Sequence, residues 1–203
     1  MRPYTLLSST LATLLVASTA AADDAPAGPR PNIVVVDGLA GLWLVHEKRG
    51  DEKAEDSSYI GTASSTLSTS HPLRLGYHRA LGTLTVGGAV HYGKVTGNIS
   101  QLVVAPRIGA WFGGESLGVW PRAGVTYGRL KVDLGAFGST VSEVMVAAEL
   151  LLVAPLAPHV GLSFGPGVEL GVSGSAKSDG ANGRSEDFKS RVIGAQLGLV
   201  ADF

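Results

Sequence analysis

Near residue 160 the sequence holds a histidine and a serine that could act together in nucleophilic catalysis. A histidine within hydrogen-bond reach of a serine hydroxyl can take its proton and so activate the oxygen. His159 and Ser163 are four residues apart, so on one β-strand both would point to the same face. Successive positions on one face of a strand do not readily bring a base against a hydroxyl, so we expect no catalytic pair here.

The remaining histidines do not suggest a metal site. His46, His71, His78 and His91 lie on or near separate segments, without the spacing of a ligand cluster. The chain contains no cysteine, which excludes thiol catalysis and disulfides. We therefore expect no catalytic residue, no metal and no cofactor, and the protein is not expected to be an enzyme.

The segments that carry these residues are predicted to be β-strands separated by turn-rich connections. The pattern predicts eight strands, near 33–46, 64–78, 82–94, 100–112, 117–132, 141–155, 159–174 and 187–203. The connections after the second, fourth and sixth strands are short: HRAL, GGES and PLAP. Most of the others are longer and polar, and the first, EKRGDEKAEDSS, is expected to be a solvated tip. An even strand number with compact turns on one side and longer loops on the other is typical of bacterial outer-membrane barrels.

The two faces of the strands favour a membrane barrel over a soluble one. In the strand near 159–174, one face is apolar from Val160 to Val172, while the other carries Gly, Ser and Glu169. A soluble barrel would bury the apolar face and expose this glycine-rich one, whereas a membrane barrel turns the apolar face to lipid. The fold class is therefore predicted to be all-β, an eight-stranded antiparallel up-and-down transmembrane β-barrel.

The same alternation places six charged residues inside the barrel. An eight-stranded interior is only wide enough to be filled by its own side chains, and a buried charge is costly unless it is paired. The bases and acids are equal in number, which favours a structural ion-pair network that plugs the barrel. The alternative is a charged constriction that gates a small pore. The six residues are Asp37, Arg74, Arg107, Arg122, Glu149 and Glu169.

Composition and the two ends of the chain predict the compartment. Only 16% of residues are charged, against about 25% in soluble domains, and the net charge of −1 gives no basic patch for nucleic acid. Residues 1–22 are predicted to be a cleaved signal peptide, 23–32 a periplasmic tether and 33–203 the barrel. The chain ends in Phe203, and a terminal aromatic after an alternating strand resembles the barrel-assembly signal of outer-membrane proteins.

Several phrases are similar to those of outer-membrane β-barrel domain proteins common in myxobacteria: VAPRIGAW, LGVWPRAGVTYG, APHVGLSFGPGVELGVSGS and LGLVADF. The resemblance covers about residues 33–203 and implies a small OmpA- or OmpX-like barrel. OmpA-like barrels carry a comparable internal salt-bridge network. The resemblance assigns no catalytic residue.

The function expected from this resemblance is a surface or structural barrel of the Gram-negative outer membrane, with a plugged interior that presents extracellular loops. A narrow porin-like diffusion channel is the alternative, and a lipid-modifying enzyme is a third. Against the third, lipid A deacylases pair His and Ser two residues apart on the outer face, and the palmitoyltransferases begin with a helix that 23–32 cannot form. The expected partners are outer-membrane lipid, lipopolysaccharide and the barrel-assembly machinery, with no nucleic acid, and we expect a monomer.

Overall fold

The computed structural model describes residues 30–51, 55–62, 72–95, 98–113, 117–133, 135, 138–178, 183 and 185–203. The predicted signal peptide, 1–22, and His71 lie outside these residues. Ten strands are found: β1 (Asn32–Arg49), β2 (Glu55–Thr62), β3 (Arg74–Leu81), β4 (Leu84–Val95), β5 (Ile99–Ala110), β6 (Phe112–Gly113), β7 (Gly118–Asp133), β8 (Gly138–Ala157), β9 (Val160–Ser178) and β10 (Ser185–Asp202).

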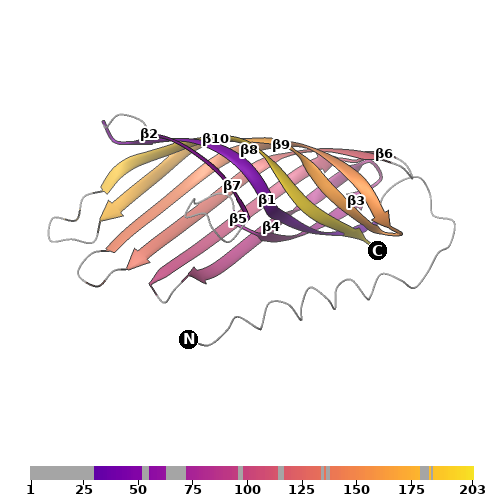
Figure 1. The fold of residues 1–203 in the computed structure, drawn as a ribbon, viewed down its shortest axis with the longest axis horizontal. Coiled ribbons are helices and arrows are strands. Elements are labelled where there is room, and N and C mark those ends of the chain that lie inside the picture. Colours follow the sequence, from indigo (N-terminus) through magenta and orange to yellow (C-terminus); the bar gives the residue numbers. More distant parts are fainter. Residues whose placement is uncertain are drawn as a thin grey trace.

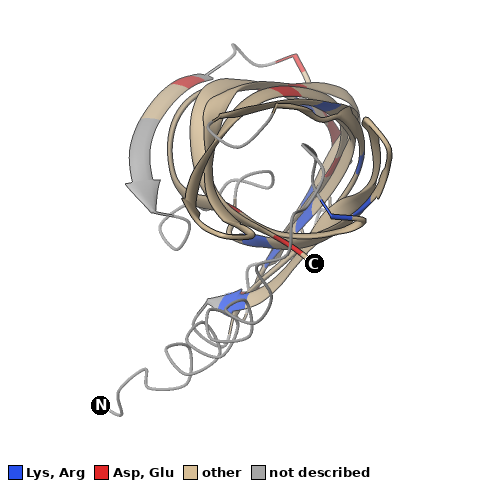
Figure 2. Ribbon diagram, turned by 90° about the vertical axis from the view of Figure 1, so that its right-hand side faces the viewer, with Lys and Arg blue, Asp and Glu red and all other residues tan. Residues whose placement is uncertain are grey.

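Eight of these strands form a closed antiparallel ring in the order β1, β3, β4, β5, β7, β8, β9 and β10 (Figure 1). β10 pairs with β1 along most of both strands and so closes the ring. The short strand β6 continues the line of β5 against β7. β2 is at the edge of the sheet and stands apart from the ring in the view along the barrel (Figure 2). The predicted all-β, eight-stranded up-and-down barrel is confirmed.

The prediction of one continuous strand over 64–78 is wrong in its described part, because Pro72 and Leu73 lie outside any strand. β3 starts only at Arg74, and residues 63–71 lie outside the described part of the chain. β2 instead follows β1 directly and pairs with its residues 40–47. The polar run EKRGDEKAEDSS is therefore not one solvated tip, because residues 47–49 end β1 and residues 55–58 begin β2.

β1 changes its partner at a bulge between Val36 and Ala40. Before the bulge, residues 32–37 of β1 pair with β3, and after it residues 40–47 pair with β2. Gly38 lies in this bulge with φ of +77°, and a Cβ there would come within 2.9 Å of the carbonyl oxygen of Pro72. Glycine is therefore needed at this position for both conformation and space.

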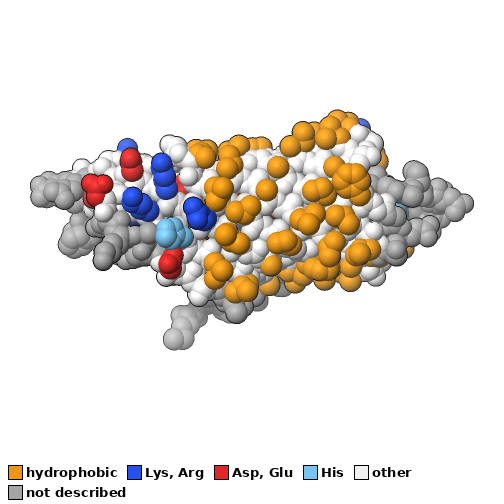
Figure 3. Space-filling view, turned by 90° about the horizontal axis from the view of Figure 1, so that it is seen from above, with side chains coloured by type: hydrophobic (Ala, Val, Ile, Leu, Met, Phe, Trp, Pro, Cys, Tyr) orange, Lys and Arg blue, Asp and Glu red, His pale blue; other side chains and the backbone are white. Residues whose placement is uncertain are grey.

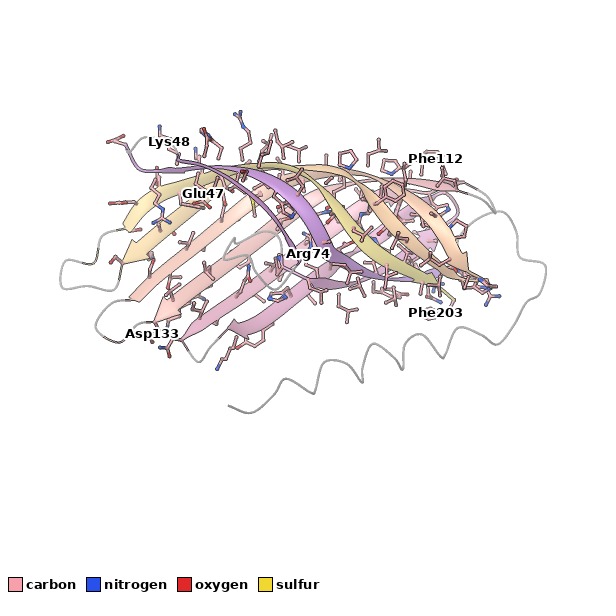
Figure 4. The ribbon with its side chains drawn as sticks, viewed as in Figure 1. Glu47, Lys48, Arg74, Phe112, Asp133 and Phe203 are labelled. Atoms are coloured by element: carbon pink, nitrogen blue, oxygen red, sulfur yellow. The ribbon has the colours of Figure 1, made fainter. Side chains whose placement is uncertain are left out.

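The two ends of the barrel differ. One end, here called the short-turn end, carries the Gly82–Thr83 and Pro158–His159 turns and both termini of the ring. There Asn32 and Phe203 exchange backbone hydrogen bonds of 3.2 and 2.9 Å across the seam between β1 and β10. Figure 4 shows Phe112 and Phe203 at this end and Glu47 and Lys48 at the other, here called the long-loop end.

The outer surface carries a wide apolar belt next to the short-turn end (Figure 3). Its aliphatic members are half-exposed, such as Ile108, Leu150 and Ile193, as predicted for the lipid-facing side of the strands. Along the described outward faces of 84–92, 102–112, 117–127, 144–156, 160–172 and 193–201, no residue is charged. The aromatic residues Tyr77, Phe112, Phe203 and Tyr92 are all exposed, near the two edges of the belt. The apolar face therefore points outward, opposite to a soluble protein.

Inside the barrel lie two apolar clusters, with charged residues between them. The cluster at the short-turn end consists of Ile33, Val35, Ala80, Trp120, Leu151, Val153 and Val200. A smaller cluster, Trp43, Val45 and Val192, lies toward the long-loop end. Trp120 is fully buried, and its indole N–H donates to Thr85 Oγ1 over 2.9 Å.

The described part of the chain contains no helix with the length and hydropathy needed to span a membrane.

Candidate functional site

The structure places all six sequence-predicted charged side chains inside the barrel, and each is at most 7% exposed. They come from β1, β3, β5, β7, β8 and β9, so six of the eight ring strands contribute one residue each. The strand alternation turns each of them inward, and the glycine-rich neighbours on the same faces leave room for long side chains. In Figure 4 Arg74 lies midway along the barrel. We call this set the charged layer.

Glu149 is the centre of the charged layer. Its Oε2 accepts a hydrogen bond of 2.8 Å from Nε of Arg122, and its Oε1 lies 3.4 Å from Nη2 of Arg107. Arg74 approaches the same carboxylate at 3.7 Å. One acid therefore faces three bases, and its loss would leave them facing each other.

The other two acids complete the pairing. Asp37 accepts from Nη2 of Arg122 at 3.1 and 3.2 Å. Glu169 lies 3.2 Å from Nη2 of Arg107 and 3.6 Å from Nη1 of Arg74, and it also accepts from the hydroxyl of Thr126. Three bases against three acids make the layer neutral, which is what a buried set of charges requires. The contacts of Arg74 are longer than those of Arg122, so Arg74 is held least tightly.

Arg107 also makes hydrogen bonds where the β5–β7 ladder is interrupted. Pro106 has no N–H, so the opposite carbonyl of Val125 lacks its ladder partner. Strand partners are assigned at Val104 and at Arg107 but not between them. Nη1 of Arg107 donates to the Val125 carbonyl over 2.7 Å and to the Pro106 carbonyl over 3.1 Å. The arginine thus supplies the donor that the proline removes.

Several buried polar residues of the interior did not stand out in the sequence. His78 packs edge-on against Trp120 with ring centroids 4.9 Å apart, and the guanidinium of Arg122 lies 4.7 Å from the same indole. Glu143 accepts from the backbone N–H of Ser190 over 2.6 Å and from its hydroxyl over 2.7 Å. The alternation along each strand predicts that these side chains point inward. It does not predict which of them meet across the barrel, because that depends on the register between strands.

The structure does not bring His159 and Ser163 together. His159 lies in the β8–β9 turn with φ of +64° rather than on the strand, and its Nδ1 is 3.0 Å from Oδ1 of Asp202. Ser163 is buried inside the barrel. In the described part of the chain, no three His, Asp or Glu residues are placed to hold a metal ion. The described histidines His46, His78 and His91 lie on β1, β3 and β4, and His91 bonds to the Leu73 carbonyl over 2.8 Å.

Phe203 lies beside the seam and is 58% exposed. Its carbonyl accepts from the side-chain amide of Asn32 over 3.1 Å, and the Oδ1 of Asn32 accepts from Tyr77 and Arg79. The ring of Phe203 thus adds little packing, while its backbone helps to close the barrel.

Comparison with known proteins finds neither a family model nor a curated protein that matches the sequence. Among solved structures, the Neisserial surface protein A is similar, with a TM-score of 0.50 and 13% identity over 87% of this chain and 99% of that one. The outer-membrane protein OprG from Pseudomonas aeruginosa gives 0.47 and 13% over 86% and 98%. The attachment invasion locus protein Ail of Yersinia pestis gives 0.34 and 13% over 83% and 99%. By its closed ring of strands and its likeness to the Neisserial protein, this chain has the fold of the small eight-stranded outer-membrane β-barrels.

Proposed function

We propose that the protein is a monomeric, non-catalytic barrel of the bacterial outer membrane, closed inside, that holds its long-loop end at the cell surface. The apolar belt supports the location, because an outward apolar face of this extent is stable only against lipid. The buried side chains inside the barrel support the proposal of a closed interior. The charged layer crosses the barrel between two apolar clusters, which leaves the interior occupied by its own side chains.

The conductance of the purified barrel in planar lipid bilayers tests the closed interior. We expect no discrete channel openings, because a solute would have to displace Arg122, Glu149 and the fully buried Trp120 together. A general porin from the same preparation serves as the positive control. Regular openings whose conductance scales with salt would instead support the narrow diffusion channel.

Phe203 is proposed to act as the signal read by the barrel-assembly machinery. Deleting it is expected to cause periplasmic accumulation and degradation in cells, while refolding into detergent stays near normal. The deletion also removes the backbone bonds to Asn32, so Phe203→Ser is the matched variant that keeps them. Outer-membrane fractions probed by immunoblot measure the effect. Normal levels of both variants in the outer membrane would show that the terminal ring is not read.

A further inference from the structure

The outer wall just above the apolar belt carries a row of polar residues across three strands. Asp56 on β2 lies opposite His46 on β1, which lies opposite Arg191 on β10. One step nearer the belt, Ser58, Leu44 and Ile193 form the next row. Residues directly opposite in neighbouring strands have their Cβ atoms about 5 Å apart, so each row is a continuous surface. The boundary between polar and apolar wall therefore passes between these two rows.

A surface cavity of about 330 Å³ lies at this boundary. Leu44 and Ile193 provide its apolar part, and both side chains are about half exposed. His46, Asp56 and Arg191 provide its polar part, together with Ser57 and Ser58. A cavity with one apolar and one polar side fits an amphipathic molecule better than a wholly polar or wholly apolar one.

The charge of this wall is basic overall. Lys48 and Lys189 are opposite each other one row above, and both are exposed. Asp56 is already paired with Nδ1 of His46. Among the described residues no ion pair of Arg191 is found. The guanidinium of Arg191 and the two lysines therefore favour an anionic group at this height.

We propose that this cavity binds the headgroup of a phosphorylated glycolipid of the outer leaflet. The inference rests on the proposed membrane location, because the belt sets the height of the acyl chains. An acyl chain would lie on Leu44 and Ile193, and a phosphate would lie against Arg191. Asp56 and the two serines would bind sugar hydroxyls, which hydrogen-bond well to a carboxylate and to a hydroxyl.

Binding of purified diphosphorylated lipid A to the folded protein in detergent, followed by native mass spectrometry, tests this proposal. Arg191→Gln is expected to weaken binding about tenfold or more, since it removes a charge-assisted contact to phosphate. His46→Gln is expected to weaken it less. Arg129→Gln is the matched control, because Arg129 is an exposed, outward-facing arginine on β7, away from the cavity. It should change the affinity by less than about twofold.

Two further lipids separate the possible sources of the phosphate. Dephosphorylated lipid A should bind about tenfold more weakly than the diphosphorylated form if Arg191 holds a phosphate. Equal affinity for phosphatidylglycerol and lipid A would mean a general anionic surface and would overturn the glycolipid assignment. Equal losses in Arg191→Gln and Arg129→Gln would overturn the site. Insertion into lipid vesicles, read from the heat-dependent gel shift of the folded form, tests the membrane location separately, so a protein that inserts but retains no lipid A refutes this inference alone.

Discussion

Replacing Glu149 by Gln is expected to destabilise the barrel by about 3–5 kcal/mol, the usual cost of breaking a buried ion pair by removing one partner. Glutamine keeps the shape of the side chain, so the change tests its charge. Without that charge, Arg74, Arg107 and Arg122 share only two acids in an interior where repulsion is weakly screened. Urea unfolding in lipid vesicles measures the free energy.

A double-mutant cycle shows whether the charged layer acts as a unit. Adding Arg122→Gln to Glu149→Gln should cost less than the sum of the two single changes, because the second change removes a base that the first left uncompensated. Arg107→Gln should behave in the same way. Arg74→Gln alone should cost less than Arg122→Gln alone, because the contacts of Arg74 are 3.5–3.7 Å long and those of Arg122 are 2.5–3.2 Å long. Pairing Glu149→Gln with the exposed Lys177→Gln is the control, and the two should add. Additive energies for the arginines would mean that these residues do not stabilise one another.

Phe164→Arg is expected to cost about 2–4 kcal/mol, the range for a basic residue on the lipid face of a barrel near the middle of the bilayer. Phe164 points outward from β9 between Leu152 of β8 and Leu197 of β10, so the new charge would have no polar neighbour. Unfolding in vesicles again gives the free energy.

Ser175→Arg is the matched control on the same strand and the same face. Ser175 lies above the belt, opposite Ser142 on one side and Asp187 on the other, so an arginine there stays in water near an acid. Its cost should be close to zero. Similar costs at the two positions would contradict the assignment of the belt to lipid.

Except for the second strand, the alternation of residue types was enough to predict the ring strands and their faces. On β8 and β9 a period of two runs for more than twelve residues, and a shift by one residue would turn every charge to the outside. The inward direction of Arg107, Arg122 and Glu149 follows from this pattern alone. Their common height follows from counting back to a short turn, because a tight hairpin fixes the register of its two strands.

The second strand could not be predicted, for a physical reason. The residues STLSTSH are polar on both faces, so alternation gives no register there. The structure has β1 exchange β3 for β2 at the bulge that holds Gly38, a glycine that lies close to Pro72 far along the chain. The wall cavity on β1, β2 and β10 was missed for a different reason: Asp56 lies in a charged run that was predicted to be a solvated tip, whereas it lies on a strand beside His46.

Arg107 links two parts of the molecule whose formation is usually considered separately. Its guanidinium pairs with acids from β8 and β9, and the same group bonds to carbonyls of β5 and β7 at the gap left by Pro106. The arginine that supplies the donor missing at Pro106 is therefore also a base of the charged layer. Any substitution of Arg107 therefore removes two kinds of contact together: the ion pairs to Glu149 and Glu169 inside the barrel, and the hydrogen bond to the Val125 carbonyl in its wall.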